Sequence, residues 1–175
     1  MWRGVGYEIQ TFEDETNLGC YGLAENSRSM TCGSTGFTKA DYENTMDANL
    51  AYFLYLQGDA VGLMTFDDQI REYLPARHRT GHLRHLMLAL EKPPGGAATN
   101  LDRPLQRILE IVKKRGLMMV ISDFLAPLEN LERNLISLAA CGHEVMLLQV
   151  LDPAELAFTF DTASLFLDLE SGREL

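Results

Sequence analysis

The stretch Leu117-Met118-Met119-Val120-Ile121 is an almost continuous apolar run, and Ser122-Asp123-Phe124 follows it directly. A run of this kind is typical of a parallel strand that is buried on both faces of a sheet. Residues 145–150 repeat the pattern, and residues 19–24 and 60–66 are two further predicted strands. The sequence therefore predicts a sheet built from short strands that lie far apart along the chain.

Between these runs the apolar residues recur at the spacing of an α-helix, at i, i+3, i+4 and i+7. This spacing predicts amphipathic helices with the following buried faces: Tyr42, Met46, Leu50, Phe53 and Leu54; Leu83, Leu86, Met87 and Leu90; Leu101, Leu105, Ile108 and Val112; and Leu128, Leu131, Leu135 and Leu138. Strands that alternate with helices predict a three-layer α/β sandwich with a mostly parallel sheet. A turn at Asp67-Asp68 and a short strand from Ile70 to Leu74 predict one antiparallel edge strand.

The composition limits the classes of function. The chain has 175 residues, of which 46% are hydrophobic, and 15 Lys and Arg against 25 Asp and Glu give a net charge of −10. This acidic balance argues against nucleic-acid binding and against contact with an anionic membrane, because both need clustered basic residues. No apolar run approaches the roughly 20 residues of a membrane span, and no secretion signal is visible. Three widely spaced cysteines fit reduced thiols, so the sequence predicts a cytoplasmic protein.

Polar side chains follow the predicted strands. Glu25, Ser27 and Ser29 come after the first strand, Asp123 comes after the strand at 117–121, and Thr99 precedes the third helix. Ligands of parallel α/β sheets bind outside the carboxyl ends of the strands, so we expect these side chains to converge. All of them offer oxygen, which suits Mg²⁺, Mn²⁺ or Ca²⁺ rather than zinc.

At these residues the sequence resembles a von Willebrand factor A (vWA) domain, and more closely the bacterial DUF58 family. The resemblance is ordered along nearly the whole chain. The stretches that carry it are Trp2-Arg3, residues 12–18, Cys20-Tyr21, Ser27-Arg28-Ser29-Met30, residues 58–63, Gly95-Gly96 ahead of Thr99, Ile121-Ser122-Asp123, residues 142–145 and residues 151–156.

The resemblance implies a Rossmann-like sheet with a metal-ion-dependent adhesion site of the form Asp-x-Ser-x-Ser, then Thr, then Asp. Carried over residue by residue, Ser27 and Ser29 match the two serines, Thr99 the threonine and Asp123 the second aspartate. Glu25 stands where the pattern has its first aspartate, and its extra methylene changes the reach of the carboxylate by about 1.5 Å. Mg²⁺ demands near-octahedral geometry, so Glu25 is the member that puts the site in question.

The resemblance also implies a function. Members of this family resemble adhesion and co-chaperone modules, often encoded beside MoxR-type AAA+ ATPases, and are not known as enzymes. An open position on the metal would take an acidic side chain from a protein partner. We expect residues 1–18 to be a lead-in segment and residues 19–175 to be a vWA-like domain, the whole being a fragment of a longer protein.

Two other functions stay open at this point. A metal-dependent phosphohydrolase could use Asp123 and Glu25, but apart from Arg28 no Lys or Arg is adjacent to either loop in the sequence. A degenerate module could bind partners without metal, and the glutamate at position 25 is the reason to consider it.

Several motifs also have purely structural readings. Ser27 and Ser29 could cap a turn. His78, His82 and His85 share a helical face, but the arginines around them favour a solvated basic face over a metal site. Residues 33–39 lack the Gly-Lys-Ser/Thr ending of a phosphate-binding loop, so we expect a turn in which Thr38 caps the next helix.

Overall fold

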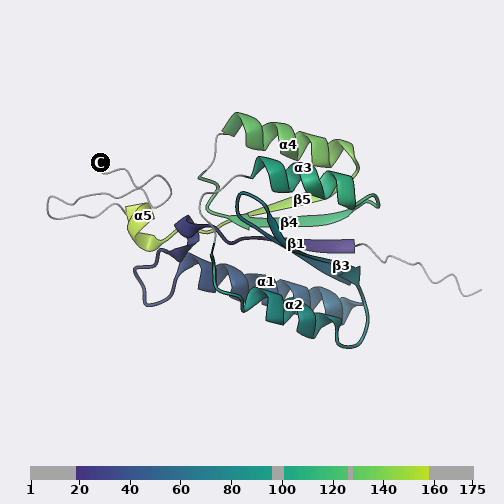
Figure 1. Cartoon of the computed structure of the whole chain (residues 1–175), viewed down its shortest axis with the longest axis horizontal. Coiled ribbons are helices and arrows are strands. Elements are labelled where there is room, and N and C mark those ends of the chain that lie inside the picture. Colours follow the sequence, from purple (N-terminus) through teal and green to yellow (C-terminus); the bar gives the residue numbers. More distant parts are fainter. Residues whose placement is uncertain (1–18, 96–100, 126–127, 158–175) are drawn as a thin grey trace, which may run out of the picture.

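The computed structural model describes residues 19–95, 101–125 and 128–157 (Figure 1). The predicted lead-in segment and Thr99 lie outside these residues. The elements are β1 (Gly19–Glu25), the 3₁₀ turn η1 (Arg28–Thr31), α1 (Lys39–Gln57), β2 (Ala60–Phe66), β3 (Ile70–Arg77), α2 (His82–Leu90), α3 (Asp102–Ile111), β4 (Gly116–Ser122), α4 (Leu128–Ala140), β5 (Glu144–Gln149) and α5 (Pro153–Ala157).

The five strands form one sheet in the order β3-β2-β1-β4-β5. β1 pairs in parallel with β2 and with β4, β4 pairs in parallel with β5, and only β3 is antiparallel to its neighbour. The predicted mostly parallel sheet with one antiparallel edge strand is therefore confirmed, although β3 is longer than expected. The chain order reverses between β1 and β4, where Ala24 lies opposite Ile121, and this is the point at which such sheets bind ligands.

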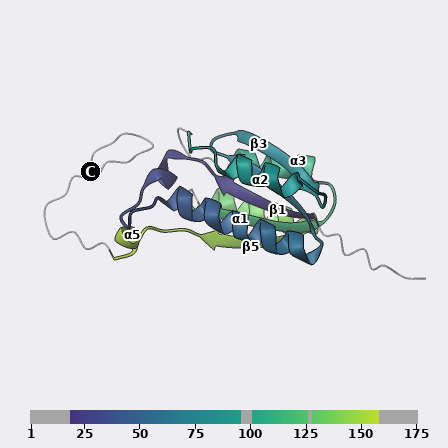
Figure 2. The ribbon, with the colours of Figure 1, turned by 90° about the horizontal axis from the view of Figure 1, so that it is seen from below.

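Helices cover both faces of the sheet, as predicted. α1 and α2 pack on one face, and α3 and α4 pack on the other (Figure 1). Figure 2 shows α1 and α2 from below, in front of the sheet. Side chains alternate along each strand, so Leu23 belongs to the core under α3 and α4 while Ala24 belongs to the core under α2. Leu105 and Ile108 of α3 are fully buried, and Leu86 of α2 is only 1% exposed. This confirms the apolar faces predicted for α2 and α3.

The face predicted for the first helix is wrong in part, because Met46, Leu50 and Leu54 pack against the core whereas the two aromatic members do not. Tyr42 and Phe53 are 50% and 58% exposed, whereas the side of α1 against the sheet carries Lys39, Glu43 and Asp47. Thr38 begins the helix with a capping box, as expected. The pattern misled because aromatic residues occupy part of the outer face and three charged residues lie among the apolar ones on the inner face, which is unusual for an amphipathic helix.

The prediction that β5 is buried on both faces is also wrong. Met146 and Leu147 are 43% and 45% exposed. β5 is the last strand of the described sheet and pairs on one side only, so an apolar run here does not mean complete burial.

Gly62 lies in β2 where this strand packs closely against β1 and β3, so a substitution of this glycine tests the packing. A Cβ at this position would lie 2.7 Å from the Tyr21 ring and 2.8 Å from the backbone nitrogen of Ala76. Because the backbone cannot yield easily, we expect Gly62→Ala to lower the free energy of unfolding by about 2 kcal/mol in urea denaturation. Gly95→Ala is the control, since its Cβ would come no closer than 4.0 Å to another atom, and an equal effect of both changes would contradict this packing.

Candidate functional site

The candidate site lies at the carboxyl ends of β1 and β4. Glu25 is the last residue of β1, and Asp123 directly follows β4. Both carboxylates are fully buried, as is Ser27, and Ser29 is nearly so. Because β1 and β4 are neighbours in parallel register, residues far apart in the sequence emerge at the same edge.

Glu25 is the centre of a row of hydroxyl groups. Ser27 Oγ donates to Glu25 Oε1 over 2.5 Å, and Ser122 Oγ donates to Glu25 Oε2 over 2.5 Å. The Ser27 and Ser29 hydroxyls are 2.9 Å apart. The structure thus brings together three of the predicted site residues, and it adds Ser122, which was not predicted as a site residue. These serines bond to Glu25 or to each other rather than capping η1, which has no side-chain cap.

Asp123 has a different partner, the side chain of Lys39. Lys39 Nζ lies 2.9 Å from Asp123 Oδ2 and 2.9 Å from Glu155 Oε1. Burial by itself would lower the pKa of Lys39, but the hydrogen bonds to Glu155 and Asp123 raise it above its ordinary value. Lys39 therefore remains a charged ammonium group inside the site.

Lys39 was not predicted from the sequence as a site residue. Its ammonium group shows that Arg28 is not the sole source of positive charge near the loops that follow β1 and β4. Lys39 is 84 residues from Asp123 along the chain, and the first turn of α1 carries it across the edge of the sheet. One signal was available. A cation at the first position of a helix is unfavourable next to the positive end of the helix dipole, so a lysine there suggests a buried anionic partner.

The described residues do not fit a divalent cation as they are arranged. The ammonium group of Lys39 lies against Asp123, and both oxygens of Glu25 already accept hydrogen bonds. Within residues 19–95, 101–125 and 128–157, no group of three or more His, Cys, Asp or Glu is placed to hold a metal. Since Thr99 lies outside these ranges, the predicted ligand set of Glu25, Ser27, Ser29, Thr99 and Asp123 stays a prediction.

Two further carboxyl groups lie beneath the site, on the inner face of α1. Glu43 Oε1 accepts the backbone N–H of Glu25 over 2.7 Å, while Glu43 Oε2 and Asp47 Oδ2 have no hydrogen-bond partner among the described residues. Burial, together with the neighbouring Asp47, raises the pKa of Glu43 well above its usual range. Burial raises the pKa of Asp47 to about 7. Protonation therefore explains how these unpaired oxygens are tolerated.

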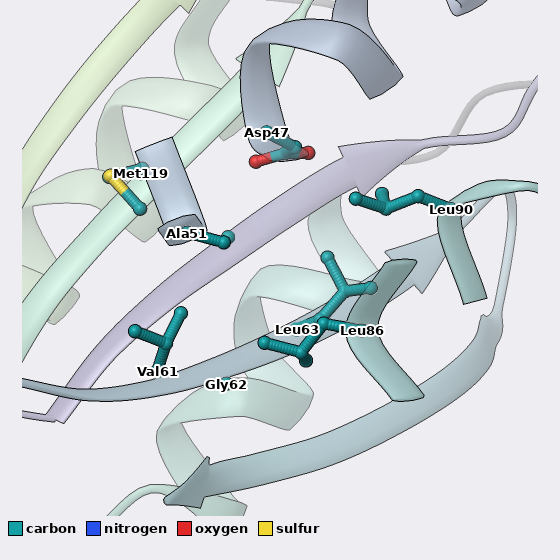
Figure 3. Close-up of a pocket in the computed structure, with 9 residues that line it drawn as sticks. Asp47, Ala51, Val61, Gly62, Leu63, Leu86, Leu90 and Met119 are labelled. Atoms are coloured by element: carbon teal, nitrogen blue, oxygen red, sulfur yellow. The ribbon is translucent and has the colours of Figure 1, made fainter. Parts of the chain in front are cut away.

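Asp47 borders a small cavity of about 10 Å³ between α1 and the sheet (Figure 3). Leu63, Leu86 and Leu90 form its apolar wall on the side of β2 and α2. A Cβ at Gly22 would lie only 2.7 Å from Asp47 Oδ1, so the glycine in β1 makes room for this carboxyl group. The cavity has about the volume that one water molecule requires.

A larger groove of about 370 Å³ lies beside Lys39 at the same edge of the sheet. One wall consists of the loop that leads into α1, with Phe37 52% exposed and Tyr42 on the first turn of the helix. The other wall consists of residues 149–153 and Leu156 of α5. The Phe37 and Tyr42 rings are stacked, with centroids 6.4 Å apart. The groove is thus largely apolar and aromatic, and it opens next to the buried ion pair.

His82 and His78 contact the protein backbone. A ring nitrogen of His82 lies 2.8 Å from the Val61 carbonyl oxygen, and His82 is buried, so the expected solvated face is wrong for this residue. The His78 ring packs on the Tyr55 ring, and its Nε2 atom hydrogen-bonds to the backbone carbonyl oxygen of Tyr55.

This arrangement of elements defines the class of protein as an α/β domain with a vWA-like fold. Two solved structures share it. A superposition on an aerotolerance-related membrane protein from Bacteroides fragilis covers 90% of this chain and 80% of that one, with a TM-score of 0.69 and 14% identity. BatB from Bacteroides thetaiotaomicron gives a TM-score of 0.63 at 15% identity, over 75% of this chain and 66% of that one. Identities this low establish a common fold alone.

The chain belongs to the DUF58 family, whose model, described as a protein of unknown function, matches residues 3–175. The uncharacterized proteins Rv1480 of Mycobacterium tuberculosis and Mb1516 of Mycobacterium bovis are both 27% identical to it over 154 residues. The matches cover 86% of this chain and 48% of each relative, so the chain spans about half the length of these proteins. None of the helices that the structure describes has the length and apolar character needed to cross a bilayer.

The buried acid on α1 makes the stability of the domain depend on pH. Between about pH 4 and pH 7 the Asp47 carboxyl is ionised in the unfolded chain but protonated in the folded one. The folded state then binds more protons, so the free energy of unfolding falls as the pH rises. We expect Asp47→Asn to remove this contribution. The free energy of unfolding of the variant, relative to that of the wild type, should therefore rise by up to about 1.4 kcal/mol per pH unit in this window.

Urea denaturation at about pH 5 and about pH 7 measures the difference. The control is Glu132→Gln on the exposed side of α4, which should follow the wild type at both pH values. If the free energy of unfolding changed by the same amount in Asp47→Asn and in the wild type between the two pH values, the raised pKa of Asp47 would be contradicted.

Proposed function

We propose that this domain is a non-enzymatic protein-interaction module that binds a partner at the carboxyl edge of its sheet. The observation that carries the proposal is the groove beside Lys39, which exposes aromatic side chains at the carboxyl edge of the sheet, next to the residues that follow β5. Stacked rings of this kind are typical anchors of protein interfaces. The partner that we propose is a MoxR-type AAA+ ATPase, in an assembly or chaperone-like task in the cytoplasm, as the family resemblance implies.

The burial of the acidic groups supports a binding role over catalysis. A phosphohydrolase needs a carboxylate or a metal-bound water that the substrate can reach. Asp123 and Glu25 are fully buried, and both are engaged in hydrogen bonds with their neighbours. Lys39 could in principle stabilise a phosphoryl group, but it is 3% exposed and already paired with two carboxylates.

A metal-dependent form of the module is the second candidate, and the hydroxyl row at Glu25 is the observation that favours it. Ser27 lies within hydrogen-bond distance of both Glu25 and Ser29, which gathers three oxygen-bearing side chains of the kind that hold Mg²⁺, Mn²⁺ or Ca²⁺. In this form Thr99 and Asp123 complete the protein's ligands, and an acidic side chain of the partner takes the open position. It requires Lys39 to leave Asp123.

Phe37→Asp tests the groove as the binding surface. A carboxylate in this apolar groove should weaken binding to a purified MoxR-type ATPase at least about tenfold, measured by calorimetry, because central aromatic anchors dominate interface energies. The matched control is Ile136→Asp, which changes an equally apolar, 60% exposed residue on α4.

Equal weakening by both variants would contradict the groove, and no binding by the wild type would contradict the choice of partner. Hydrolysis of any compound in a panel of phosphoesters, lost in Asp123→Ala, would replace the proposal with the enzyme.

A further inference from the structure

Lys39 places a positive charge at the edge of the sheet where the family resemblance predicts a divalent cation. We propose that the ammonium group of Lys39 takes the place of that cation, so that the binding edge of this domain is held together without a metal. This inference rests on the proposed function, because it concerns how the walls of the same groove are joined.

The ammonium group connects three segments that are distant in the sequence. From the first turn of α1 it donates to Asp123 after β4 and to Glu155 on α5, over 2.9 Å in both cases. Lys39 is 3% exposed and Asp123 is fully buried, so water does not replace either partner in this pair. A bound metal would have the same mechanical effect, since it would draw side chains from separate loops onto one centre.

A second set of contacts ties the same two walls of the groove together. Asp152 accepts the backbone N–H of Ser34 over 2.7 Å and its hydroxyl over 2.5 Å. Glu155 Oε2 accepts the Asp152 N–H over 2.8 Å, which holds the other carboxylate oxygen toward Lys39. The position of α5, and with it that of Leu156 in the groove, therefore depends on the ion pair together with the contacts between Asp152 and Ser34.

The hydrogen bonds also leave little for a metal to bind. Asp123 Oδ2 accepts from Lys39, and Asp123 Oδ1 accepts the Leu125 N–H over 3.1 Å. A dication at Asp123 would have to displace the ammonium group or lie beside it, and like charges repel strongly in a buried environment. A displaced Lys39 would lose one of its two carboxylate partners while it remained buried, and this is costly.

Thermal melting of the purified domain with magnesium or with EDTA, at constant ionic strength, tests the proposal. The wild type should melt at the same temperature in both. Lys39→Met should melt about 10 °C lower in EDTA, because Asp123 loses its counter-charge. Saturating magnesium should then raise the melting temperature of this variant by about 5 °C, since the place of the cation is vacated.

Two further variants control for trivial effects. Lys92→Met removes an exposed lysine that pairs with Glu72, and it should change neither the melting temperature nor the response to magnesium. The double variant Lys39→Met with Asp123→Asn should recover much of the lost stability, because both buried charges are gone, and it should not respond to magnesium.

A magnesium-dependent rise in the wild type that Asp123→Asn abolishes would overturn the proposal, and so would a Lys39→Met variant on which magnesium has no effect. If Lys39→Met does not fold in EDTA, recovery of the folded state with magnesium supports the proposal. Failure to recover, while the double variant folds, overturns it.

These readouts need no partner, so they stay interpretable if the ATPase does not bind. Calorimetric binding of magnesium to the wild-type domain alone, lost in Asp123→Asn, would overturn this inference while it leaves the interaction module standing.

Discussion

The parallel pairing of β1 with β4 is the constraint on which the rest of the site depends. It places the end of β1 and the end of β4 at one edge of the sheet, so that Ser122 and Ser27 donate to different oxygens of the same carboxylate. Parallel strands of this kind need helical crossovers, which here cover both faces and exclude water from the sheet. The polar groups at the edge are therefore buried as they emerge, and each must find its partners within the protein.

Burial of charge links the parts of this edge. Glu43 supports the end of β1 through the Glu25 N–H, while Lys39 neutralises Asp123. Both come from the inner face of α1, a face that would carry apolar side chains if packing were its only role. The helix thus replaces part of its apolar contact with the sheet by an ammonium group and two acids beneath the binding edge. This exchange exposes Tyr42 and Phe53 on its outer side, and Tyr42 becomes part of the groove.

Much of the fold could be predicted, because its signals are local. The strands at 60–66 and 117–121, the apolar faces of α2 and α3 and the capping box at Thr38 depend on neighbours within a few residues. The candidate site could be predicted only in part. Glu25, Ser27 and Ser29 lie close in sequence and follow a strand, so their grouping was accessible. The pairing of Lys39 with Asp123 was not, because 84 residues separate them.

The sequence by itself determined the class of fold, the strands and most helices, and the oxygen-rich character of the carboxyl edge, because periodicity and residue chemistry are properties of short segments. Only the tertiary structure decided which face of α1 lies inward, how far β5 is exposed, and which positive charge lies against Asp123. Those outcomes depend on the order of the strands and on the distance between helix and sheet. Both result from the packing of the whole domain, and no single segment of the chain encodes them.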